Sequence, residues 1–158
     1  MGVSYESLGT DTLWKKKLIF SSVFIEATKL QTAFDRNKRE VSSKQWLLLV
    51  IASSFSEPPT LTEVGELMGC SRQNVKKIAV ILEKKGYLTL TNIKDKRSLC
   101  IELANKYKLL SAEMEAETDA VMDLLFGEFT DDQVNEFFNG MLKLSKGIEA
   151  LDKYFQKN

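Results

Sequence analysis

The feature that most constrains this fold is a change of hydrophobic period at Gly86. Before it, residues 60–86 repeat apolar side chains with the spacing of helices. After it, residues 87–103 alternate apolar and polar side chains with the two-residue period of strands. Two short helices followed directly by a hairpin are the order of elements in a helix-turn-helix with a β-wing.

Local signals set the ends of the two short helices. Thr60 and Glu63 form a capping box at the start of the first. Gly69 suits its end, because glycine tolerates positive φ. Ser71 caps the second helix. The second helix has an apolar back with i, i+3, i+4, i+7 spacing: Val75, Ile78, Ala79 and Leu82. The pattern predicts a helix-turn-helix over about 60–86.

A hairpin with a basic tip is predicted over about 87–103. Residues 87–91 and 97–103 alternate, and residues 92–96 lie between them. In the second strand Leu99, Ile101 and Leu103 share one side, which leaves Ser98, Cys100 and Glu102 on the polar side. Cys70 is expected to be a small buried hydrophobic residue.

Long helices are predicted on both sides of this unit. The first runs over about 11–34, before a polar break at 35–40. A second capping box, Ser42 and Gln45, precedes an apolar run over 46–52 that is predicted to be the buried central helix. An acidic helix over 104–126 ends at Gly127, and a third capping box, Thr130 and Gln133, opens the last helix. That helix carries an apolar stripe: Val134, Phe137, Met141, Leu144, Ile148, Leu151 and Phe155. One chain of 158 residues cannot easily bury all this apolar surface, so a partner is implied.

The charge of the chain is zero overall but is divided unevenly. Residues 71–97 hold eight lysine and arginine residues against two acidic residues, a net charge of +6. Residues 104–158 hold six lysines against eleven acidic residues, a net charge of −5. Because binding to phosphates depends on the local field, the helix-turn-helix and its wing are predicted to face nucleic acid.

Catalysis and metal binding have little support in this composition. The chain has no histidine, which is the commonest metal ligand and general base, and it has only two cysteines. No signature indicates an enzyme, a cofactor or a metal site. The sequence shows neither a signal peptide nor a long apolar run, which predicts a cytoplasmic protein without a membrane span.

With these elements in order, the chain resembles the MarR family of winged helix-turn-helix regulators over nearly its whole length. The resemblance rests on the first short helix, on Ser71-Arg72, on residues 82–86 (LEKKG) and on Asp95-Lys96-Arg97 in the wing. It implies a mainly α fold with a β-hairpin wing in a single domain over 1–158. Residues 11–40 and 104–158 are then dimerisation helices, and 42–103 form the DNA-binding unit.

The resemblance further implies a homodimeric regulator, most often a repressor, that binds double-stranded DNA at a pseudo-palindromic operator. The second short helix enters the major groove, and the wing reaches the adjacent minor groove. Gln73 or Asn74 suits adenine and Arg72 suits guanine, while Ser71 suits a phosphate. The predicted DNA-binding residues are Ser71, Arg72, Gln73, Asn74, Lys76, Lys77, Lys94, Lys96 and Arg97.

Two alternatives stay open from the sequence. Proteins of this kind commonly bind a small-molecule effector between the dimer helices and the DNA-binding unit, and Phe20, Phe24 and Trp46 are the candidate lining residues. Core packing explains these three aromatic residues equally well. The chain could also be a winged-helix module that binds other proteins and has no operator of its own, although the basic second helix argues against it.

Overall fold

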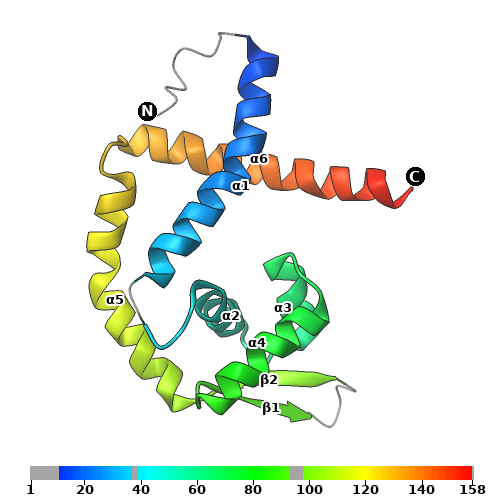
Figure 1. The fold of residues 1–158 in the computed structure, drawn as a ribbon, viewed down its shortest axis with the longest axis vertical. Coiled ribbons are helices and arrows are strands. Elements are labelled where there is room, and N and C mark those ends of the chain that lie inside the picture. Colours follow the sequence, from blue (N-terminus) through cyan, green and yellow to red (C-terminus); the bar gives the residue numbers. More distant parts are fainter. Residues whose placement is uncertain (1–10, 37–38, 93–97, 158) are drawn as a thin grey trace. The chain divides into compact units, whose positions relative to one another are not determined.

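The structure is a computed structural model that describes residues 11–36, 39–92 and 98–157. In chain order it contains α1 (Thr12–Asp35), α2 (Ser43–Ser53), α3 (Leu61–Met68), α4 (Arg72–Lys84), β1 (Leu88–Asn92), β2 (Leu99–Leu103), α5 (Asn105–Phe126) and α6 (Asp131–Gln156). Figure 1 shows this mainly helical fold with its single described hairpin. The predicted order of elements is confirmed.

The three predicted capping boxes all form. Ser42, Thr60 and Thr130 each accept a hydrogen bond from a backbone N–H three residues on, and the Gln or Glu at that position accepts one in return. The backbone at Gly69 has φ 64°, the left-handed conformation predicted for the end of α3. These ends could be predicted because each cap depends on only a few neighbouring residues.

The chain divides into two compact units, Met1–Tyr107 and Lys108–Asn158. The buried apolar residues all belong to the first unit and come from 41–101, including Leu48, Leu49 and Leu82 with no exposed surface. Helix α2 packs against α1, α3, α4 and β2, which makes it the central helix, as predicted. Leu47 is nevertheless 39% exposed, so the prediction that α2 is buried on nearly every side was wrong at this position.

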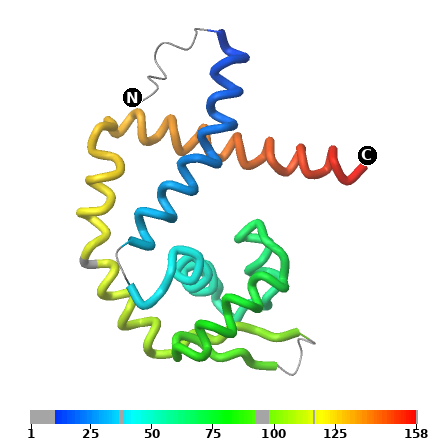
Figure 2. Tube along the Cα trace, viewed as in Figure 1, coloured from blue at the N-terminus to red at the C-terminus, as the bar shows by residue number. Residues whose placement is uncertain are grey.

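The two strands form an antiparallel hairpin in which Leu88 pairs with Leu103 and Leu90 with Ile101. Figure 2 follows the chain from α4 directly into this hairpin. At the outer side of β2, the Ile101 N–H donates to the Pro59 carbonyl at 2.8 Å. At the outer side of β1, the Leu90 N–H donates to Glu83 Oε1 at 2.8 Å. Both strands therefore have a partner beyond the hairpin.

The cysteines differ from their expected positions. Cys100 has no exposed surface, although strand alternation placed it on the polar side of β2. Beyond the hairpin, Cys100 also pairs with Thr60 in an isolated antiparallel bridge, so the chain before α3 lies beside β2 at this residue. Cys70 is half-buried rather than buried, because it lies in the turn between α3 and α4.

The long helices contrast with this core. No described residue of α1 is buried, and none of the second unit is buried either. The predicted stripe on α6 is present as a continuous face, with Phe137 52%, Met141 47% and Ile148 55% exposed. Each of the two units, taken by itself, therefore leaves the apolar surface of its long helix uncovered.

Candidate nucleic-acid interface

Helix α4 is held by its apolar back. Val75, Ala79 and Leu82 have no exposed surface, and the helix packs against α2, α3 and β1. At its start, Ser71 Oγ accepts a hydrogen bond from the Asn74 N–H at 3.3 Å. Anchoring on three sides fixes the direction in which the opposite face of α4 points.

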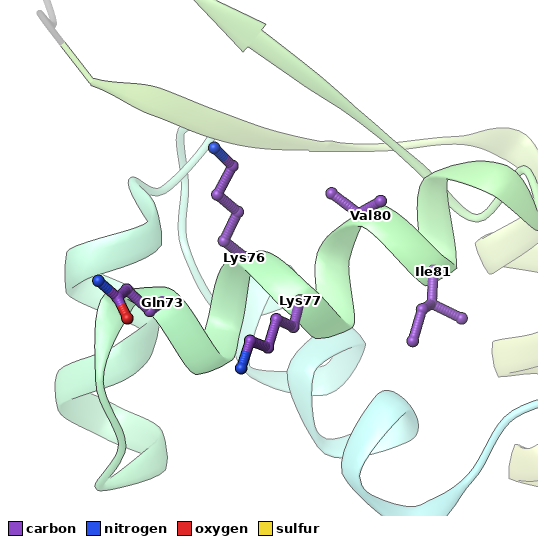
Figure 3. A pocket seen from close by; sticks show the side chains of 5 residues that line it. All are labelled: Gln73, Lys76, Lys77, Val80 and Ile81. Atoms are coloured by element: carbon purple, nitrogen blue, oxygen red, sulfur yellow. The ribbon is translucent and has the colours of Figure 1, made fainter.

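The N-cap and the first two turns of α4 expose polar side chains. The exposed residues are Ser71, Arg72, Gln73, Asn74, Lys76 and Lys77. Figure 3 shows Gln73, Lys76 and Lys77 extending away from the helix around a shallow hollow that Val80 and Ile81 complete. Six of the nine residues predicted to bind DNA thus lie together on one exposed surface.

The cations of this surface are not neutralised by other described residues. Within the described part of the chain, Arg72, Lys76 and Lys77 make no ion pair, whereas Lys29 pairs with Glu26 and Lys106 with Glu40. Unpaired cations on an anchored helix create a positive local field, which attracts a polyanion.

The hairpin follows α4 directly and is predicted to form the wing. Its strands are described as far as Asn92 on one side and from Ser98 on the other. The predicted wing residues Lys94, Lys96 and Arg97 lie outside the described residues. Their role as minor-groove contacts stays a prediction.

The turn between α3 and α4 depends on a glycine that the sequence reasoning missed. The Cys70 N–H donates to the Gly65 carbonyl at 2.9 Å, which closes the turn. A Cβ at Gly65 would lie 2.8 Å from the Cys70 carbonyl oxygen. A glycine inside a helix is unfavourable by about 0.5–1 kcal/mol relative to alanine, so its presence was a signal of close backbone approach.

A polar cluster joins the end of α4 to the segments around it. Glu40 accepts hydrogen bonds from Lys106 Nζ at 2.7 Å and from the Tyr87 hydroxyl at 2.7 Å. Lys85 Nζ donates to the Glu40 carbonyl and to Gln45 Oε1. The hydrogen bond from Lys106, followed by that from Tyr87, lowers the pKa of Glu40 below its ordinary value. The cluster fixes the C-terminal end of α4 relative to α2 and the start of α5.

The three aromatic candidates for an effector site are not brought together in one copy of the chain. Phe20 and Phe24 pack edge-to-face on α1, with ring centroids 5.3 Å apart, and both are more than 60% exposed. Trp46 packs instead against Phe34, with ring centroids 5.3 Å apart. Phe20 and Phe34 are fourteen residues apart on one helix, which corresponds to about 21 Å at about 1.5 Å per residue. Trp46 and Phe20 therefore occupy separate places.

The chain is similar to known proteins in structure but not detectably in sequence. No protein-family model and no curated protein sequence matches the chain. A MarR/EmrR family transcriptional regulator from Acinetobacter sp. ADP1 is similar, with a TM-score of 0.77 and 18% identity over 85% of this chain and 97% of that one. MarR of Staphylococcus aureus, solved with salicylate and kanamycin, has a TM-score of 0.69 and 19% identity over 88% of this chain and 95% of that one.

A third similar structure is an organohalide-sensing transcriptional regulator in its 2,4-dichlorophenol-bound form. Its TM-score is 0.72, with 15% identity over 93% of this chain and 89% of that one. Together with the anchored α4 and the hairpin, these likenesses define a winged helix-turn-helix protein. The particular form of the fold is the one found in MarR-family regulators.

The described residues contain neither a candidate membrane span nor a candidate metal site. None of the described helices combines the length and apolar character that crossing a membrane requires. Among the residues that the structure describes, no three His, Cys, Asp or Glu side chains are grouped so that they could hold a metal ion.

Proposed function

We propose that this chain is a MarR-family transcriptional regulator that binds double-stranded DNA sequence-specifically. The observation that carries the proposal is the surface of α4. It holds exposed polar residues and cations that make no ion pair with described residues, and the opposite side of the helix is buried at Val75, Ala79 and Leu82. A helix presented in this way fits the major groove, where base edges carry a distinct pattern of donors and acceptors. The wing residues Lys94, Lys96 and Arg97 then reach the adjacent minor groove.

The functional form in this proposal is a homodimer. Apolar side chains are exposed along α1 and, separately, along α6, and a partner copy would remove them from water. A twofold dimer places two copies of α4 about one helical turn of DNA apart, which matches a pseudo-palindromic operator. The proposed regulator is a repressor, because the family that the sequence resembles consists mostly of repressors.

Effector control is the second part of the proposal. Two structurally similar regulators were solved with small phenolic compounds, salicylate and 2,4-dichlorophenol. In this chain Trp46 and Phe34 form an aromatic pair, and the Arg39 guanidinium lies 5.9 Å from the Phe34 ring centroid. An aromatic pair beside a cation suits a phenolic or carboxylate ligand. Adding salicylate should lower the affinity for DNA, and Trp46→Ala should reduce that effect more than Phe20→Ala.

The salt dependence of duplex binding tests the central proposal. The logarithm of the association constant should fall linearly with the logarithm of salt concentration, with a slope of about −0.9 for each phosphate contact. Lys76→Glu and Lys77→Glu together should weaken binding and make the slope shallower. Lys146→Glu and Lys153→Glu on the acidic α6 provide the matched control and should change neither.

A salt-independent affinity would contradict the phosphate contacts and favour the alternative, a winged-helix module that binds proteins. Equal losses in the α4 and α6 charge variants would show that overall charge, and not this surface, determines binding. Salt-dependent binding that is equally tight on every duplex sequence would reject an operator.

A further inference from the structure

We infer that Gln73 and Lys77 are the side chains of α4 that determine base specificity, whereas Arg72, Asn74 and Lys76 lie on its flanks and contact the DNA backbone. This assignment rests on the proposed function. It selects two residues from a surface on which six polar residues are exposed. It also differs from the sequence-based interpretation, in which Arg72 and Asn74 were candidates for base contacts.

The buried residues of α4 define which side chains project furthest. Val75, Ala79 and Leu82 mark the direction of the core, since none has exposed surface. An α-helix turns by about 100° per residue, so Gln73 and Lys77 each lie about 160° from Val75, nearly opposite the core. By the same geometry, Arg72 lies only about 60° from Val75, and Asn74 and Lys76 about 100° from it.

The surface hollow supports this division. Its lining contains Gln73 and Lys77 but neither Arg72 nor Asn74. Figure 3 shows that Lys76, which also lines it, extends toward the hairpin. Glu83, seven residues further along α4, lies on the same side and accepts the Leu90 N–H of β1. Lys76 therefore occupies the flank nearest the wing, where DNA backbone passes between the major-groove helix and the minor-groove contact.

Because the major groove is deep, the side of α4 opposite the core is the side that reaches the base edges. The groove is about 8.5 Å deep, so a helix inserted in it presents its outermost ridge to the base edges and its flanks to the groove walls. Residues near the N-terminus of a recognition helix are the ones that contact bases. Gln73 and Lys77 satisfy both conditions, because they are the second and sixth residues of α4.

The hydrogen-bonding groups of Gln73 and Lys77 indicate which base each side chain would recognise. The Gln73 amide can donate to N7 and accept from N6 of adenine, and the Lys77 ammonium can donate to O6 and N7 of guanine. Four residues of helix span about 6 Å, which is about two base-pair steps of about 3.4 Å. Each half-site should therefore contain an adenine and a guanine about two steps apart.

Adjacent residues of the same chemistry provide matched controls. Sites would be selected from random duplexes by the full-length wild type and by four variants: Gln73→Ala, Asn74→Ala, Lys77→Met and Lys76→Met. Gln73→Ala should reduce the preference at one adenine position roughly tenfold to a hundredfold and leave the other positions unchanged. Lys77→Met should do the same at the guanine position.

The two flank variants should bind more weakly, with the base preferences of the wild type. Lys76→Met should also make the salt dependence shallower by about one phosphate contact. If the wild type enriches a motif that Gln73→Ala and Lys77→Met leave intact, this inference is rejected and the proposed function stands. Relaxed specificity in the Asn74 or Lys76 variants rejects it equally. If the wild type enriches no motif, the proposed function fails and the inference fails with it.

Discussion

At the scale of single residues, Gly65 on α3 has no room for a side chain against the turn that leads to α4. The nearest atoms to an added Cβ are the Cys70 carbonyl oxygen at 2.8 Å and Val75 Cγ2 at 3.4 Å. The first of these is backbone and cannot move alone. The distance at which α3 packs against the start of α4 therefore depends on the absence of a side chain at Gly65.

Gly65→Ala should lower the free energy of unfolding by about 1–3 kcal/mol, the usual cost of inserting a methyl group into a packed site. Urea denaturation of the variant beside Glu66→Ala, an exposed change on the same helix, measures this cost. Glu66→Ala should change the free energy by no more than about 0.5 kcal/mol. Equal stability of the two variants would mean that the turn accommodates a Cβ.

Glu40 gives a residue-scale prediction about pH. Its pKa lies below the ordinary value of 4.5, chiefly because Lys106 and then Tyr87 hydrogen-bond to the carboxylate. The ionised form therefore stabilises the fold above pH 4.5, and this contribution is lost as the pH falls through the lowered pKa. Glu40→Gln should cost less than about 1 kcal/mol at neutral pH, since the side chain is 52% exposed.

The comparison is a series of urea denaturations from neutral pH down to about pH 3. The stability difference between wild type and Glu40→Gln should shrink along the series. Lys106→Met should remove most of the same pH dependence, and the double variant should add little to it. Parallel curves at every pH would show that the hydrogen bonds to Glu40 are not stabilising its charged form.

At the scale of elements, one side of α4 is buried and the other is exposed. The adjacent residues Leu82 and Ile81 lie on these two sides, so substitutions at them can be compared. Leu82→Ala should cost about 2–5 kcal/mol, because the leucine is fully buried in the core of the first unit. Ile81→Ala should cost less than about 1 kcal/mol, because Ile81 is 44% exposed. Thermal or urea unfolding compares the two. Similar losses would mean that α4 is embedded on both sides and presents no free face.

How far the sequence predicts these elements depends on how local their causes are. The capping boxes at Ser42, Thr60 and Thr130 depend on residues three positions apart, and all three form. Cys100 is buried and pairs with Thr60, forty positions away in the sequence, and strand alternation carries no information about such long-range neighbours. Periodicity predicted the back of α4 correctly at Val75, Ala79 and Leu82, whereas Ile78 is only half-buried. The order of Gln73, Asn74 and Lys77 around the helix needed the observed core direction.

At the scale of the whole molecule, the first unit exposes an apolar face on α1 and the second unit exposes one on α6. Met141→Glu places a charge in the α6 stripe, where the methionine is 47% exposed. A twofold interface would receive that charge twice, so the variant should sediment as a monomer while the wild type sediments as a dimer. Asn139→Glu, on the polar side of α6 and also exposed, is the control and should remain dimeric.

The monomeric variant should also lose tight binding to a full operator while retaining weak, salt-dependent binding to DNA. A wild type that is already monomeric, or a Met141→Glu variant that stays dimeric, would contradict α6 as the dimer interface. If Met141→Glu stays dimeric, α1 becomes the candidate interface, because its Phe20 and Phe24 are more exposed than Met141.

The hydrogen bonds on the outer sides of the hairpin have a consequence for solubility. A two-stranded ribbon has two open edges, and open edges recruit strands from other copies into aggregates. Here the Pro59 carbonyl receives the Ile101 N–H on one edge, and the Glu83 carboxylate receives the Leu90 N–H on the other. The charged Glu83 in particular is a poor neighbour for an incoming strand. The described strands of the hairpin thus have a partner on both edges, which disfavours edge-to-edge association with other copies.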